Sequence, residues 1–187
     1  WVLADFRNTQ SAAVAAFARD VPRVQGYYSP APPELDERPY SRLLGGERLE
    51  VEITPGDFVN LFDEMRAAIR PPFAGPGTFG QYVVAKAAAA RGFDVLLSGE
   101  GGDELFGGYA RLLAAAGEPL PPGYEDYLPP DDYPVDLAGA LAYDWERLPI
   151  LLAVDEQVCA AHGLVSRAPF LDPALVAWAL ALPDRAR

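Results

Sequence analysis

A run of small and acidic residues near the middle of the chain has the types and spacing needed to handle a phosphate-containing ligand. Residues 96–109 read LLSGEGGDELFGGY. The first three glycines of this run allow backbone amides to approach a phosphate closely, and Glu100 and Asp103 place two carboxylates at the same strand end. Because carboxylates repel phosphates, a site that holds both implies a bridging hard cation, for which Mg²⁺ is the best candidate.

The same run also has a purely structural explanation. Glycines supply the bends of a tight strand-to-helix turn, and the acidic pair Asp103-Glu104 favours the first turn of a helix. Spacing alone does not choose between this explanation and a ligand site.

The elements that must position this run alternate between strands and helices. Phe93–Leu97 is a short apolar run typical of a buried parallel strand, and it leads directly into the glycine-rich turn 98–102. Such alternation indicates an open parallel α/β sheet, which binds ligands at the carboxyl ends of its strands. We expect strands at Val2–Ala4, Val24–Tyr28, Leu49–Ile53 and Phe93–Leu97, and helices at Ser11–Arg19, Asp36–Leu44, Phe58–Ile69 and Phe79–Arg91.

Helix-capping signals fix two of these boundaries. Thr54 with Asp57 three residues later is a capping box, and Thr78 is expected to cap the following helix. After Gly117 a stretch rich in proline and acids predicts a surface connection or a lid. Everything from Asp136 onward is expected to be helical, with helices at Asp136–Arg147, Leu148–His162 and Pro173–Leu182.

These elements predict one domain in three segments. Residues 1–116 form the α/β nucleotide-binding core, 117–135 the proline-rich loop and 136–187 a helical C-terminal part of the same domain.

Composition excludes several classes of protein. The 187 residues are 50% hydrophobic, which excludes intrinsic disorder, and the single cysteine excludes an internal disulfide. The net charge of −12 argues against nucleic-acid and anionic-membrane partners, and no apolar run approaches the roughly 20 residues of a membrane span. No signal-peptide pattern is visible, so we expect a cytoplasmic protein.

The central motif carries a family resemblance. Residues 95–109 resemble the synthetase domain of the asparagine synthetase family, in which a strand followed by SGEG(A/G)DELFGGY is a specific signature. The resemblance spans roughly residues 11–187 and is strongest at 91–111 and 149–183. Further similar stretches are Leu35–Tyr40, Pro72–Tyr82 and Leu151–Asp172, the last ending in Ala168-Pro169-Phe170-Leu171-Asp172.

The resemblance implies a fold and a reaction. The fold would be an open parallel sheet of the adenine-nucleotide α-hydrolase-like type with a helical C-terminal extension. The activity would be that of an ATP-dependent ligase of asparagine biosynthesis, or of a related lactam- or amide-forming enzyme. ATP and Mg²⁺ would activate a small carboxylic acid as an acyl-adenylate, and an amine, often ammonia from a glutaminase domain or subunit, would then attack it.

The resemblance also assigns roles to residues. Glu100 is the expected catalytic residue, either accepting the proton of the attacking amine or holding the activated acyl group. Asp103 is the expected ligand of the Mg²⁺–pyrophosphate group. The expected nucleotide-binding residues are Ser98, Gly99, Gly101, Gly102 and Ser11.

The sequence departs from the family at the phosphate loop, which reads S-G-G-x-D-S in the family and FRNTQS at residues 6–11 here. Arg7 and Asn8 replace the two glycines, Gln10 replaces the aspartate, and Ser11 alone matches. Losing two or three charge-assisted hydrogen bonds and a metal ligand would cost about 5 kcal/mol, or roughly 10³-fold in affinity, which Arg7 would offset only in part. A catalytically inactive pseudoenzyme or binding subunit is therefore the alternative.

Three other residues are weaker candidates. Cys159 and His162 lie three positions apart, as in a Cys–His nucleophile or half of a metal site, but a lone cysteine and a lone histidine more often belong to the core. Lys86, the single lysine, is expected on a solvated helix face, and we find no counterpart of the family's catalytic lysine.

Overall fold

The computed structural model describes residues 2–6, 21–30, 38–43, 46–71, 77–120 and 130–184. The helix expected at Ser11–Arg19 lies outside these residues. The chain divides into two compact units: Trp1–Gly99 with Ile150–Pro169 form unit 1, and Glu100–Pro149 with Phe170–Arg187 form unit 2. The division at residues 116 and 135, which follows composition along the chain, stays a prediction.

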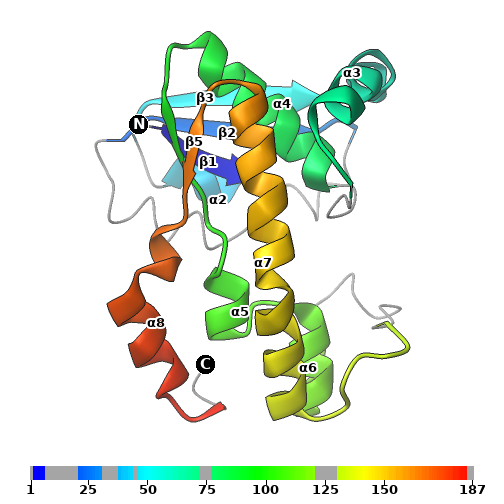
Figure 1. Ribbon diagram of the computed structural model, residues 1–187, viewed down its shortest axis with the longest axis vertical. Helices are drawn as coiled ribbons and strands as arrows, with labels where there is room; N and C mark the ends of the chain where they lie inside the picture. Colours follow the sequence, from blue (N-terminus) through cyan, green and yellow to red (C-terminus); the bar gives the residue numbers. More distant parts are fainter. Residues whose placement is uncertain are drawn as a thin grey trace. The chain divides into compact units, whose positions relative to one another are not determined.

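Unit 1 is built on a five-stranded, all-parallel sheet (Figure 1). This arrangement confirms the expected α/β class and open parallel sheet. The strands are β1 (Val2–Phe6), β2 (Arg23–Tyr28), β3 (Arg48–Ile53), β4 (Val95–Leu97) and β5 (Val165–Arg167), in the spatial order β3-β2-β1-β4-β5.

The strand order reverses at β1. The chain moves outward through β2 and β3, then returns to the other side of β1 for β4 and continues to β5. Leu97 at the end of β4 pairs with Leu3 of β1 and with Arg167 of β5. Open parallel sheets bind their ligands outside the carboxyl ends of the strands at such a reversal.

Helix α4 (Gly77–Ala90) covers one face of this sheet, where it contacts β1, β2 and β3. Helix α3 (Pro55–Ala68) packs against α4, and α2 (Arg38–Leu43) precedes β3. The apolar core between these elements also includes Val154, Val158 and Cys159 from the second half of α7 (Leu137–Ala161).

The capping box at α3 is present as expected. The Asp57 amide donates to Thr54 Oγ1 at 3.2 Å, and the Thr54 amide donates to Asp57 Oδ2 at 2.8 Å. The cap expected at Thr78 is wrong, because α4 already begins at Gly77 and the Thr78 side chain is buried inside it. Thr78 therefore lies within the first turn of the helix and not before it.

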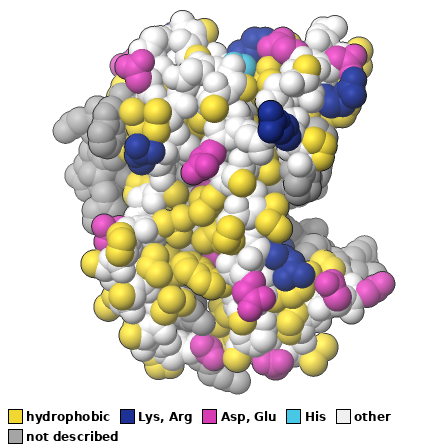
Figure 2. Space-filling model, in the orientation of Figure 1, with side chains coloured by type: hydrophobic (Ala, Val, Ile, Leu, Met, Phe, Trp, Pro, Cys, Tyr) yellow, Lys and Arg dark blue, Asp and Glu magenta, His cyan; other side chains and the backbone are white. Residues whose placement is uncertain are grey.

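Unit 2 consists of helices α5 (Gly102–Phe106), α6 (Ala110–Ala116), the first half of α7, and α8 (Pro173–Leu180). Leu112, Tyr133, Ala140 and Leu141 form its buried core. Helix α8 carries no charged residue, and Figure 2 shows hydrophobic side chains gathered over the part of unit 2 that α5 and α8 occupy.

Two expectations for the C-terminal third are wrong. The helices expected at Asp136–Arg147 and Leu148–His162 are one helix, α7, which continues through Pro149. The intrinsic cost of an interior proline is overridden here, since buried residues on both sides, Leu148 and Val154, anchor the helix.

The segment after α7 is not all helical, since it contains β5. This strand has three residues, and only its middle one, Ser166, is half-buried. A strand this short shows no apolar alternation, and it forms because β4 offers it a hydrogen-bonding edge. None of the described helices is long and apolar enough to cross a lipid bilayer.

The capping box gives a stability prediction. Thr54→Ala removes the hydroxyl that accepts the Asp57 amide, and we expect a loss of about 1 kcal/mol in the free energy of unfolding. Urea denaturation monitored by circular dichroism measures it. Thr54→Ser keeps the acceptor and is the matched control; an alanine variant as stable as the serine variant would contradict this role.

Candidate functional site

The carboxyl end of β4 is the first part of the candidate site. Ser98 and Gly99 directly follow β4 and are buried. The Ser98 amide donates to the Arg167 carbonyl of β5 at 2.8 Å, whereas Ser98 Oγ is buried with no hydrogen-bond partner in the described part of the chain. A buried hydroxyl without a partner at the strand-order reversal is free to accept or donate a hydrogen bond to a ligand.

Unit 2 begins with Glu100, which is half-buried, and Gly101. Gly101 has a φ of 89°, and a Cβ at this position would collide with the Leu171 side chain. Leu171 belongs to the second motif noted in the sequence, so packing between the two motifs explains why residue 101 is glycine. The packing of Leu171 and the positive φ therefore explain the glycine at position 101 without any ligand.

Asp103 lies in the first turn of α5 beside other carboxyl groups. Burial, together with the nearby Glu104 and Asp144 carboxylates and against the Arg111 guanidinium, raises the pKa of Asp103 to about 7. When the pKa of a carboxyl group is raised, its charged form is disfavoured, and a bound cation would stabilise that form.

The donor set at Asp103 fits Mg²⁺ with restrictions. It consists of oxygens only, which suits a hard cation. However, the described residues contain no group of three metal-ligating side chains. Protein ligands for Mg²⁺ are often just one or two carboxylates completed by phosphate oxygens, so Asp103 fits a metal that arrives with a phosphate-bearing ligand rather than a dedicated metal centre.

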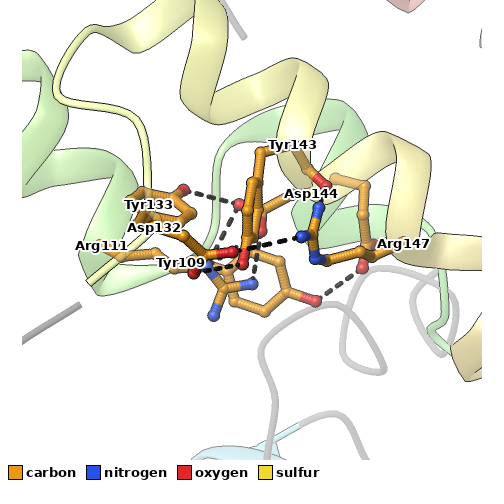
Figure 3. A network of polar contacts seen from close by, with 8 residues as sticks. Tyr109, Arg111, Asp132, Tyr133, Tyr143, Asp144 and Arg147 are labelled. Carbon is orange, nitrogen blue, oxygen red and sulfur yellow. Dashed lines mark hydrogen bonds and ion pairs between the residues drawn. The ribbon is translucent and has the colours of Figure 1, made fainter. Parts of the chain in front are cut away.

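A polar network in unit 2 surrounds these carboxylates (Figure 3). The Arg111 guanidinium binds the buried Asp144 through Nε to Oδ1 at 3.0 Å and Nη2 to Oδ1 at 2.8 Å, and the Tyr133 hydroxyl donates to Asp144 Oδ2 at 2.8 Å. Asp144 is therefore satisfied from two sides by donors on α6 and on the loop before α7.

Tyr109 connects this pair to the central motif. Its hydroxyl donates to Oε1 of the buried Glu104 at 2.6 Å, and its ring lies 3.7 Å from the Arg111 guanidinium carbon. Burial and the Glu104 carboxylate raise the pKa of the Tyr109 hydroxyl, so it stays a donor. Arg111 thus supplies positive charge to the carboxyl groups at 103 and 144, while Glu104 is stabilised by the Tyr109 hydroxyl.

The outer side of the network is more exposed. Asp132 Oδ2 lies 3.7 Å from Arg147 Nη2, and the Tyr143 hydroxyl donates to Asp132 Oδ1 at 3.1 Å. Figure 3 shows these three residues together. The sequence did not reveal this network, because Arg111 and Asp144 are 33 positions apart. The single local signal is Tyr109, which closes the glycine-rich motif.

A second buried polar pair in unit 1 joins α7 to β5. The Ser166 hydroxyl donates to Asp155 Oδ2, and burial raises the pKa of Asp155. Cys159, one turn after Asp155, is fully buried, and desolvation raises its pKa to about 12. It is a core residue, as expected, and no thiolate forms there near neutral pH.

The other weak candidates also have structural explanations. The His162 ring packs against Tyr82 with centroids 4.5 Å apart. Lys86 Nζ pairs with Glu64 Oε1 at 2.7 Å on the surface, as its expected solvated position implies. Ser11 and residues 7–10 lie outside the described residues; β1 ends at Phe6, so this segment starts from the carboxyl end of β1.

Comparisons with known proteins agree with the central motif. The model of the asparagine synthase family matches residues 9–143 and 137–187. A putative glutamine-hydrolysing asparagine synthetase of Methanocaldococcus jannaschii is 35% identical over 106 residues, which is 54% of this chain and 17% of that protein. A glutamine-hydrolysing asparagine synthetase of Bacillus subtilis is 41% identical over 66 residues, 35% of this chain and 10% of that protein. The matched stretches thus span a small part of these relatives.

Asp103 gives a pH-dependent stability prediction. Its folded pKa is raised, so the native state binds this proton more tightly than the unfolded state, and the carboxyl group costs stability progressively as pH rises from about 4 to about 7. In magnesium-free buffer, Asp103→Asn should stabilise the protein by about 1–2 kcal/mol at pH 8 and by much less at pH 4.5.

Urea denaturation at the two pH values measures this difference. Asp131→Asn, at an exposed aspartate, is the control and should show no such dependence. If Asp103→Asn raises the free energy of unfolding equally at both pH values, the pKa of the Asp103 carboxyl group is not raised in the native state.

The Arg111–Asp144 pair gives a second stability prediction. Arg111→Leu leaves the Asp144 carboxylate buried without its cation and should cost about 3–5 kcal/mol. The double variant Arg111→Leu/Asp144→Asn should lose clearly less, because the neutral amide oxygen still accepts the Tyr133 hydroxyl. Denaturant midpoints of the two variants measure these losses. A double variant that loses as much stability as Arg111→Leu, or more, would argue against coupling between the two residues.

Proposed function

Because the chain belongs to the asparagine synthase family, we propose that it is an ATP-dependent amide-forming ligase domain of the adenine-nucleotide α-hydrolase-like type. One observation carries the proposal: the buried Ser98 hydroxyl, which has no hydrogen-bond partner among the described residues, stands at the carboxyl end of β4, where the strand order reverses. The family motif continues from there into Glu100 and Asp103.

The reaction has two steps. One oxygen of a small carboxylic acid attacks the α-phosphorus of ATP, the bond from that phosphorus to its bridging oxygen breaks, and pyrophosphate leaves. The nitrogen of an amine then attacks the acyl carbon, and AMP leaves with the acyl oxygen. Ammonia is the amine we propose, supplied by a glutaminase domain or subunit, since the two relatives are named as glutamine-hydrolysing.

Each residue of the motif has a task in this scheme. Ser98 and Gly99 line the nucleotide, together with Gly101, Gly102 and Ser11. Asp103 would hold Mg²⁺, which when bound neutralises charge on the departing pyrophosphate. Glu100 accepts the proton of the attacking amine or holds the activated acyl group, both of which suit a half-buried carboxylate.

Arg111 and Tyr109 support these carboxylates without touching substrate. By holding Asp144 and Glu104 in fixed hydrogen bonds, they leave Asp103 as the carboxyl group of this cluster without a hydrogen bond to a side chain of the described residues. The network therefore prepares one carboxylate for a cation while neutralising its neighbours.

A non-catalytic binding subunit is the second candidate function. The replacement of two glycines and an aspartate at Arg7, Asn8 and Gln10 favours it, because these positions would grip pyrophosphate in the family. We therefore expect Mg-ATP binding in the millimolar range, which isothermal titration measures. Micromolar binding would show that the altered loop still holds the nucleotide.

Glu100 separates the two functions. With Mg-ATP, ammonium salts and a panel of small carboxylic acids, amide formation by Glu100→Gln should fall about 10²- to 10⁴-fold below wild type. Glu118→Gln, at an exposed glutamate, is the matched control and should keep wild-type rates. Ammonium as the amine source removes any need for a glutaminase.

Pyrophosphate exchange in the same reactions reports the first step alone. Exchange that depends on the carboxylic acid supports the ligase. If no acid supports exchange, or if Glu100→Gln and wild type form amide equally, the ligase proposal fails and the binding role replaces it.

A further inference from the structure

Arg167 is the last residue of β5 and lies beside the nucleotide-facing end of β4. It pairs in register with Leu97, and its carbonyl accepts the Ser98 amide at 2.8 Å. Neighbouring strands lie about 4.8 Å apart, well within the length of an extended arginine side chain. All of these residues belong to unit 1.

The Arg167 guanidinium has no charged partner in the part of the chain that the structure describes. It is exposed, and its one hydrogen bond runs from Nη1 to the neutral Ser166 carbonyl at 2.8 Å. Most other described cationic side chains are paired, as Lys86 is with Glu64 and Arg111 with Asp144. In a chain with 27 acidic and 15 basic residues, an arginine without an acid is unexpected.

Other arginines without a described ion pair have a local reason that Arg167 lacks. Arg70 and Arg91 follow the ends of α3 and α4, where the helix dipole favours positive charge. Arg48, at the amino end of β3, is paired with Glu50 at 3.1 Å, so it needs no such reason. Among the described residues, Arg167 is the one lysine or arginine at the carboxyl end of a strand.

The backbone of Arg167 is held on a rigid element. The Val165 amide donates to the Asp94 carbonyl at 2.9 Å, and Ser166 binds Asp155 of α7. Since side chains alternate along a strand, Arg167 leaves the sheet on the face opposite to Ser166 and α7. A fixed backbone with a guanidinium that has no charged partner among the described residues is the arrangement expected of a ligand-binding arginine.

We propose that Arg167 binds the phosphate chain of the nucleotide. This inference rests on the proposed function and assigns a phosphate-binding cation to it. A guanidinium binds phosphate oxygens bidentately and stays charged at all relevant pH values. Because the phosphates of a nucleotide are negatively charged, a phosphate site at the carboxyl edge of the sheet needs a positive group. The loop at residues 7–10, with its altered glycines, makes that need greater.

Binding measurements on phosphate-bearing and phosphate-free probes test this assignment. The probes are Mg-ATP, magnesium pyrophosphate and adenosine, and ligand-observed NMR titrations measure their affinities. Arg167→Gln should lower the affinity for Mg-ATP and for magnesium pyrophosphate about 10- to 100-fold and leave the affinity for adenosine unchanged. Arg167→Lys keeps the positive charge but not the bidentate guanidinium. Its affinity for the two phosphate-bearing probes should lie between those of wild type and Arg167→Gln. Arg91→Gln makes the same charge change at the end of α4 and should bind all three probes as wild type does.

The outcomes separate this inference from the proposed function. If wild type binds Mg-ATP and adenosine but Arg167→Gln binds Mg-ATP and pyrophosphate equally well, the role of Arg167 is wrong and the nucleotide site stands. If wild type binds neither Mg-ATP nor adenosine, the nucleotide site itself is wrong and Arg167 loses its ligand. Should Arg167→Gln fail to fold, as seen by circular dichroism, Arg167→Lys carries the comparison.

Discussion

A carboxylate that leaves water needs a positive charge or hydrogen-bond donors near it, and this constraint organises unit 2. The carboxyl groups at positions 103, 104 and 144 lie in one network, in which the Arg111 guanidinium pairs with Asp144 and lowers the pKa of Asp103. Tyr109 and Tyr133 donate their hydroxyl protons to Glu104 and Asp144, so two of the carboxylates are stabilised within the fold. Asp103 keeps the unfavourable charge, which the cation proposed for this motif would offset.

Unit 1 shows the complementary arrangement at the ends of its strands. Its carboxyl edge carries the buried Ser98 hydroxyl, which has no hydrogen-bond partner within the described part of the chain, and the Arg167 guanidinium, which has no charged partner there. A short parallel strand, β5, is what brings Arg167 to that edge, and the Asp155–Ser166 hydrogen bond fastens the strand to α7. Residues far from the glycine-rich motif in sequence therefore position Arg167 at the edge of the sheet where that motif begins.

Much of the fold followed from local sequence signals. Strands at β2 and β3 and the start of α3 were predicted closely, because apolar alternation and the Thr54–Asp57 box act within a few residues. Tertiary packing overrode local signals elsewhere. Pro149 did not break α7, Thr78 was buried rather than capping, and β5 has no pattern of its own apart from its neighbour β4.

The candidate site was predicted less completely for the same reason. The motif from Ser98 to Asp103 is continuous in sequence and could be recognised, whereas Arg111 with Asp144 and Ser98 with Arg167 meet through the fold alone. Gly101 has a packing role besides its proposed role in ligand binding, since the Leu171 side chain leaves no room for a Cβ at that position.

The central claim is that the acidic motif and a polyanionic nucleotide require a divalent cation between them. The most direct test compares ATP binding in excess Mg²⁺ with ATP binding in EDTA, for wild type and Asp103→Asn. We predict that removing Mg²⁺ weakens ATP binding to wild type at least about tenfold and changes the variant little. ATP binding by wild type that is equally strong in EDTA would contradict the claim.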